Sequence, residues 1–267
     1  MKTFTIGKKK IVLKEEWMVG FITTWIVGLL AHAYRFFNFL PIWDSIYNFT
    51  GVGSTYTLGR WFLGYAGLIT SMFDLPWVNG AFSLFYISIV VILLTEMFEI
   101  KNKGMIVLCA AIFVSFPTVV SSFAYMYTAD AYLLAFLLAT LAVYLTWCVK
   151  KWGTIAGMVC LAFAMGIYQA YATVAIVLVL LYIIRQFVIE KLDFLEAVRK
   201  DLKYLGMLVG GAVLYAVILK ITLIRYNITL PGYQGIGALG IMSLGQYKAA
   251  LQKTLYHFRL ILGMEHG

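Results

Sequence analysis

Long apolar runs separated by short polar connections make up most of the chain. A helix needs about 20 apolar residues to cross the hydrocarbon layer of a membrane, and runs near this length recur along the sequence. Seven runs are predicted to span the membrane: residues 17–34, 77–98, 105–122, 129–149, 154–168, 170–187 and 206–223. The fifth run is short enough to form one bent element with the sixth around residues 166–171, so the predicted count carries an error of about one.

The connections between the spans divide the chain into three parts. Residues 1–16 are predicted to be a cytoplasmic N-terminus, and residues 17–224 a membrane module with a long external loop at 35–76. Residues 225–267 form an external C-terminal segment in this interpretation. Most connections are short, so the long, aromatic-rich loop is the unusual feature, and an active site at the membrane surface would explain it.

Three segments outside the spans have their own patterns. Residues 57–73, in the external loop, are predicted to form a helix in the interface with Trp61, Phe62 and Tyr65 at headgroup depth. Residues 189–205 repeat leucines at helical spacing among mixed charges, which predicts an amphipathic helix on the inner surface. Residues 241–262 are also predicted to be helical.

Composition and charge agree with a membrane protein. The chain is 63% hydrophobic and 12% charged, which leaves too little polar surface for a soluble domain. Its net charge is +9, but a cytoplasmic N-terminus places most of the 21 Lys and Arg residues on the cytoplasmic side, as the positive-inside rule expects. No polar segment carries a basic stripe with interleaved aromatic residues, so nucleic acid is not an expected partner. The prediction is an all-α, polytopic bundle in the cell membrane.

Asp44 is the first candidate for chemistry. It lies among Ile42, Trp43 and Tyr47 directly outside the first span. An aromatic setting of this kind predicts a partly desolvated carboxylate, which is a better general base than an exposed one. The alternative is an Asp that makes a local turn or caps a short helix at Ser45.

Arg60 is the second candidate, within Gly59-Arg60-Trp61. An Arg at the start of an interfacial helix suits the binding of an anionic group. The alternative is that Arg60 snorkels to lipid phosphate while Trp61 anchors the helix.

Asp130 is the third candidate, with Tyr125, Tyr127 and Tyr132 nearby in the sequence. Charged groups at membrane depth are costly and therefore usually functional. The alternative is an N-cap for the fourth span.

Tyr168 and Gln169 interrupt the fifth and sixth runs on the same outer side. Gln169 could equally satisfy backbone groups at a helix break. Polar residues from three separate connections thus share the predicted outer face, which a binding site requires: Asp44, Arg60, Asp130 and Gln169.

The order of these motifs resembles a known family. An external Asp among aromatic residues is followed by Gly59-Arg60-Trp61, a Pro-containing third span, Thr128-Ala129-Asp130 and Tyr168-Gln169-Ala170. This order is similar to that of the polytopic glucosyltransferases that modify O-antigen, within the GT-C class of membrane glycosyltransferases.

The resemblance implies an enzyme that transfers a hexose, with glucose expected, from a polyprenyl-phosphate donor to a cell-envelope glycan or lipid on the outer face. It implies Asp44 as the catalytic base and Asp130 as a second acidic group of the site. Arg60 would bind the donor phosphate. The remaining residues expected to bind substrate are Trp61, Tyr47, Tyr168 and Gln169.

The chain departs from the family pattern in two ways. Members often carry a second acidic residue after the loop Asp, where this chain has Ser45; a divalent metal is therefore left open and no cofactor is certain. Members are also usually longer, which leaves a fragment, a truncated product and a partner-dependent subunit as interpretations. Two other hypotheses remain beside the enzyme: a transporter or flippase of lipid-linked sugars, and a non-catalytic partner of a longer transferase.

Overall fold

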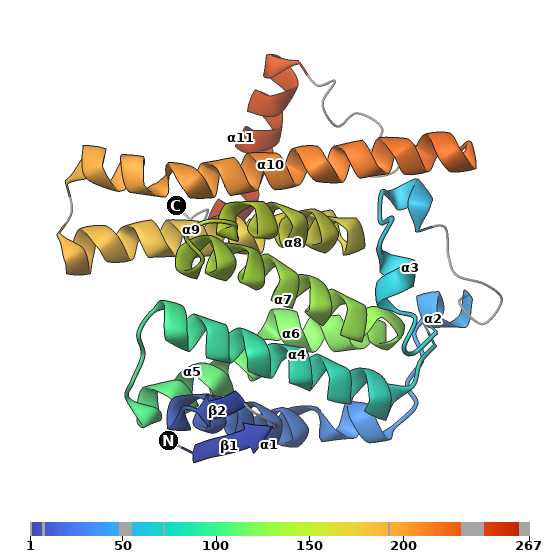
Figure 1. Cartoon of the computed structure of the whole chain (residues 1–267). Coiled ribbons are helices and arrows are strands. Elements are labelled where there is room, and N and C mark those ends of the chain that lie inside the picture. Colours follow the sequence, from blue (N-terminus) through green and yellow to red (C-terminus); the bar gives the residue numbers. More distant parts are fainter. Residues whose placement is uncertain are drawn as a thin grey trace.

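The computed structural model describes residues 2–6, 9–47, 55–71, 73–191, 193–230 and 243–261. Its main body is a bundle of helices that run side by side (Figure 1). Every predicted apolar run is helical, so the all-α prediction is confirmed. The long helices are α1 (Glu15–Phe37), α4 (Pro76–Met97), α5 (Lys103–Ser115), α7 (Met126–Cys148), α8 (Gly153–Ile167), α9 (Ala172–Arg185) and α10 (Phe194–Tyr226).

Several of these helices are long and apolar enough to cross a membrane, which makes this a multi-pass membrane protein. By length and composition, five described segments qualify: Glu15–Phe37, Pro76–Met97, Lys103–Cys148, Gln169–Glu190 and Arg199–Tyr226. The segment Lys103–Cys148 contains both α5 and α7, and α8 is a shorter apolar helix. The predicted count of about seven spans therefore stays a prediction.

The helices pack in a connected series. Helix α1 packs on α4 and α5, α4 packs on α7, and α7 packs on α8 and α9, while α10 covers α8. Helix α7 occupies the centre of this series and carries fully buried Ala131, Ala135, Ala139 and Ala142. Small residues of this kind let membrane helices approach closely, which explains the position of α7.

Two ends of the bundle are named after the predicted orientation. The inner end is where α1 begins and α4 ends. The outer end is where α4 begins, and there the short helices α2 (Trp43–Tyr47) and α3 (Leu63–Ala66) gather (Figure 1). Other short helical pieces at the outer end are η2 (Tyr56–Leu58), α6 (Pro117–Ser122), η3 (Phe123–Tyr125) and η4 (Gln169–Tyr171).

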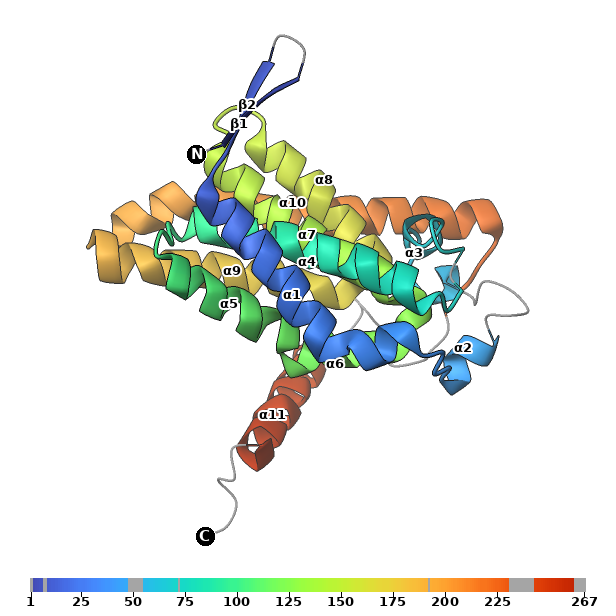
Figure 2. The same ribbon diagram turned by 90° about the horizontal axis from the view of Figure 1, so that it is seen from below.

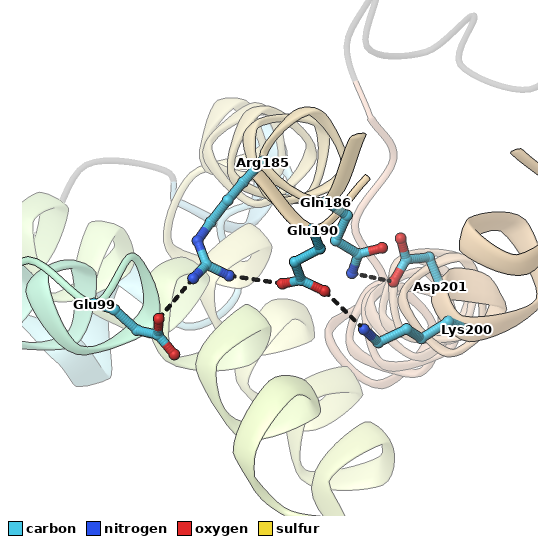
Figure 3. Close-up of polar contacts among 6 residues, drawn as sticks. All are labelled: Glu99, Arg185, Gln186, Glu190, Lys200 and Asp201. Carbon is cyan, nitrogen blue, oxygen red and sulfur yellow. Dashed lines mark hydrogen bonds and ion pairs between the residues drawn. The ribbon is translucent and has the colours of Figure 1, made fainter. Parts of the chain in front are cut away.

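At the inner end, a network of charged and polar side chains connects α9, the π-helix η5 (Gln186–Glu190) and α10 (Figure 3). Arg185 donates to Glu99 at 2.8 Å and to Glu190 at 2.9 Å, and Lys200 donates to Glu190 at 3.1 Å. Gln186 Nε2 donates to Asp201 Oδ1 at 3.2 Å. The contact between Glu99 and Arg185 joins segments that are far apart in the sequence.

Two local predictions need correction. Residues 57–73 do not form one interfacial helix, because Gly59 has a φ of +72° and ends η2. The predicted inner-surface helix at 189–205 is not separate, because nothing breaks the helix at Gly206 and α10 runs without interruption from Phe194 to Tyr226. The N-terminal segment contains a two-stranded antiparallel hairpin, β1 (Lys2–Ile6) and β2 (Lys9–Leu13), rich in the β-branched residues that favour strands.

The helix predicted at residues 241–262 is present as α11 (Leu244–Ile261). Its side chains at residues 244–260 are all exposed. Figure 2 shows α11 and the β1–β2 hairpin projecting from the bundle in different directions. Neither element contributes to the outer end.

Candidate functional site

Two tyrosine side chains hold Arg60 in place at the outer end. Its Nη1 donates a hydrogen bond to the Tyr132 hydroxyl at 3.1 Å, and its guanidinium carbon lies 4.4 Å from the centre of the Tyr168 ring. The Tyr132 and Tyr168 rings are stacked, 5.5 Å apart. Within the described residues Arg60 forms no ion pair, and its buried Nε has no hydrogen-bond partner. A cation held by two tyrosines and unmatched by a carboxylate is suited to bind an anion.

The backbone beside Arg60 is held by two side chains from other helices. Gln169 Nε2 donates to the Leu58 carbonyl at 2.8 Å and to the Tyr215 hydroxyl at 2.9 Å, and that hydroxyl donates to the Gly59 carbonyl at 3.0 Å. A Cβ at Gly59 would lie 2.6 Å from Gln169 Nε2. The glycine is therefore required by this contact as well as by its positive φ. Gln169 supports the segment that carries Arg60, which goes beyond the local role of satisfying a helix break.

Trp61 is buried, in contrast to its predicted position at headgroup depth. It is 7% exposed and makes an edge contact with Phe163, with ring centres 5.2 Å apart. Gly166 makes room for the indole, because a Cβ there would lie 2.6 Å from the Trp61 ring. Phe62 N also donates to the Gly166 carbonyl at 2.8 Å. Trp61 therefore anchors the Gly59-Arg60-Trp61 segment to the bundle.

Asp130 is buried in a separate polar cluster. Its exposed fraction is 2%, its Oδ1 accepts from Asn79 Nδ2 at 3.1 Å, and its Oδ2 accepts from Thr70 Oγ1 at 3.2 Å. Helix α7 begins at Met126, so Asp130 lies inside the helix and is not its N-cap. The carboxylate joins the external loop and the start of α4 to α7.

Asp44 is exposed, so the predicted partial desolvation is not observed. The local hydrogen bond in α2 is made by Ser45, whose Oγ accepts from Ile42 N at 3.3 Å. Asp44 lies within electrostatic range of Tyr127, as does Arg60. Tyr47 is the last residue of α2, and its side chain lies outside the described part of the structure.

Tyr56 joins the external loop to the end of α10. Its ring stacks on that of Tyr226, with centres 5.1 Å apart. Burial, with a hydrogen bond to Tyr65, raises the pKa of Tyr56 to about 12. The phenol therefore stays neutral at physiological pH.

A large cavity adjoins the Arg60 position. Its volume is about 660 Å³, and α5, α6, η3, α7, η4 and α9 contribute to its wall. The wall is mostly apolar, with Phe113, Phe136 and Val174, and it includes both Tyr132 and Tyr168. The cavity thus reaches the two residues that hold Arg60. The cavity was not predictable from the sequence, because the aromatic and aliphatic residues of its wall resemble the other residues of membrane-spanning helices.

A metal site is not apparent in the described ranges. No group of three or more His, Cys, Asp or Glu side chains among those residues is placed to hold a metal ion. The divalent metal left open by the sequence stays an untested expectation.

Comparison with known proteins adds one finding. A family model described as Glucosyl transferase GtrII matches residues 33–262, a range that contains all of the candidate site residues. No curated protein and no solved structure shows a significant match to the chain.

Proposed function

Because the chain belongs to the GtrII glucosyltransferase family and is a membrane glucosyltransferase, we propose that it transfers glucose on the outer face from a polyprenyl-phosphate donor to a cell-envelope glycan or lipid. Family membership favours an enzyme over the transporter hypothesis. The observation that carries the finer proposal is the unpaired Arg60 cation next to the apolar cavity.

The donor would use both features together. A polyprenyl-phosphate sugar combines a long apolar chain with an anionic phosphate, so it needs an apolar surface beside a fixed cation. The cavity provides the apolar surface, and Tyr132 and Tyr168 connect that surface to the Arg60 guanidinium. The phosphate would pair with Arg60 by charge-assisted hydrogen bonds.

The reaction follows from this placement. The acceptor hydroxyl attacks the anomeric carbon, and the Asp44 carboxylate takes the proton of that hydroxyl. The bond between the anomeric carbon and the phosphate oxygen breaks, and its electron pair leaves with polyprenyl phosphate, whose charge Arg60 stabilises. The exposed Asp44 lacks the partial desolvation expected from the sequence, but its exposure lets an acceptor that arrives from outside the membrane reach the carboxylate.

Asp130 has a different role in this proposal from the direct contact expected from the sequence. Both of its oxygens are already used by Thr70 and Asn79, and the side chain is buried. These contacts support a positioning role, in which Asp130 holds the external loop against α7.

The test uses membranes that contain the full chain, a radiolabelled polyprenyl-phosphate glucose and a cell-envelope acceptor fraction. We expect label to move to the acceptor, and Asp44→Asn to reduce the rate by roughly 10²–10⁴-fold, the usual contribution of a general base. Asp193→Asn is the matched control, because Asp193 is an exposed carboxylate at the inner end. Full activity of Asp44→Asn would remove Asp44 from the mechanism, and absence of transfer by the wild type would contradict the proposed donor or acceptor.

A further inference from the structure

Asp74 is a buried carboxylate at the outer end, just before α4. The residue is 9% exposed, and both carboxylate oxygens are buried with no hydrogen-bond partner among the residues that the structure describes. It forms no ion pair within the described residues. Burying a charge in this way is costly unless the group is paired. An unpaired buried group in a native structure therefore requires an explanation.

The nearby cation does not provide one. Arg35 interacts electrostatically with Asp74, but its guanidinium donates hydrogen bonds to backbone carbonyls. It donates to Phe123 O at 2.8 Å, Leu40 O at 2.6 Å and Ala124 O at 3.3 Å. Arg35 therefore fixes the backbone around the outer end and leaves both Asp74 oxygens free.

The backbone on both sides of Asp74 is rigidly held. Phe73 N donates to the Thr70 carbonyl at 3.0 Å, and Leu75 N donates to Asn79 Oδ1 at 2.9 Å. The side chains of Thr70 and Asn79 in turn donate to the buried Asp130, so the segment is tied to α7. A well-positioned group that remains unpaired at a cost in stability is typical of a binding site.

We infer that Asp74 binds sugar, its two carboxylate oxygens accepting hydrogen bonds from two neighbouring hydroxyls of a hexose at the outer end. The inference rests on the proposed function for the presence of a hexose. A carboxylate has only acceptors and the adjacent hydroxyls of a hexose are donors, so the two groups are complementary. Entry of the sugar requires the side chains of Phe73 and Leu75, residues that are both 41% exposed, to swing aside while the hydrogen-bonded backbone stays in place.

The surroundings of Asp74 favour a sugar over a metal ion as its ligand. Asp74 belongs to no group of three or more His, Cys, Asp or Glu in the described residues that could hold a metal ion. A neutral polyol needs only the two acceptor oxygens that Asp74 leaves free. Hydrogen bonds to a charged acceptor are also stronger than neutral ones. A sugar that lacks one of the two bound hydroxyls should therefore bind measurably more weakly.

The first measurement compares glucose with its deoxy analogues in the wild type. Polyprenyl-phosphate donors that lack single hydroxyls are tested for transfer and for the rise in thermal midpoint that they cause in the full chain. We expect loss of either of two neighbouring hydroxyls to reduce transfer by about 10- to 100-fold and to reduce the rise in midpoint. Acceptors that lack single hydroxyls form the second arm, which distinguishes an acceptor sugar from the donor sugar.

The second measurement repeats the series with Asp74→Asn. This variant should lose the discrimination against those analogues, and its thermal midpoint without ligand should exceed that of the wild type, because an unpaired buried charge is removed. A merely structural Asp74 would instead make Asp74→Asn less stable. Asp201→Asn is the control, because Asp201 is also buried with one unpaired oxygen but lies at the inner end. The Asp201→Asn variant should discriminate against the deoxy analogues as strongly as the wild type does.

The outcomes separate this inference from the proposed function. Equal transfer and equal thermal shifts with glucose and every deoxy analogue, or full discrimination by Asp74→Asn, would overturn the inference. A lower thermal midpoint of Asp74→Asn would overturn it too. If the wild type transfers no sugar but polyprenyl-phosphate glucose stabilises it more than Asp74→Asn, the proposed reaction fails and the inference stands.

Discussion

The two ends of the bundle treat their charges in opposite ways. At the inner end, Lys14 pairs with Glu96 and Lys103 with Glu15. Arg185 pairs there with both Glu99 and Glu190 (Figure 3). At the outer end, by contrast, the charged side chains that the structure describes form no ion pairs, although both signs are present: Arg35, Arg60, Asp44, Asp74 and Asp130. The same chain thus neutralises its charges at one end and keeps them separate at the other.

The difference indicates where ligands bind. Paired charges at the inner end connect helices and leave little unbalanced charge for a ligand. Unpaired charges at the outer end carry a cost in stability, and a ligand with complementary groups can repay it. The comparison therefore predicts that removing Arg60 or Asp44 affects activity more than stability, and that removing a paired charge at the inner end does the reverse.

Arg60→Ala should have the largest effect on activity. Arg60 has no carboxylate partner to leave unpaired, so the fold should tolerate its loss, while the leaving phosphate would lose its cation. We expect the transfer rate to fall by roughly 10²–10³-fold, as when one preorganised electrostatic stabiliser is removed. Transfer rates and thermal midpoints of the same preparations would check this, and a large loss of stability with an unchanged rate would break the comparison.

Arg185→Ala should have an intermediate effect, on stability. The Arg185 side chain is 13% exposed and pairs with two carboxylates, so its removal is expected to destabilise the protein by about 1–2 kcal/mol. The thermal midpoint should fall, while the transfer rate per folded molecule stays near that of the wild type. A rate loss equal to that of Arg60→Ala would show that the inner network acts on the site.

Lys103→Ala should have the smallest effect. The Lys103 and Glu15 side chains are both more than half exposed, and water and salt screen such a pair. We expect no measurable change in thermal midpoint or transfer rate at physiological salt. A clear fall in midpoint that high salt abolishes would instead show that this exposed pair holds α1 against α5.

The helical architecture was predictable from the sequence. Apolar runs of membrane length can satisfy their backbone groups only within helices or closed barrels, and each predicted run is helical, although the run at residues 105–122 is divided into α5 and α6. The motif around Gly59, Arg60 and Trp61 was also recognisable, because it belongs to the pattern that resembles the GtrII family. These features depend on local composition and order.

The roles of individual residues depended on tertiary structure. Asp44 and Asp130 looked alike as carboxylates among aromatic residues, yet Asp44 is exposed and Asp130 is enclosed by Thr70 and Asn79. Asp74 was visible in the sequence as one more loop charge, and only its burial without a partner made it a candidate.

The physical reason is the range of the interactions involved. Hydrophobic length and helix-breaking residues act over a few neighbouring positions, so the sequence alone determined which segments are helical and apolar. The Arg60 position depends on Tyr132, Tyr168, Gln169 and Tyr215, which are distant in the chain. Which charges are paired, and which stay free for a ligand, was decided only when the helices packed together.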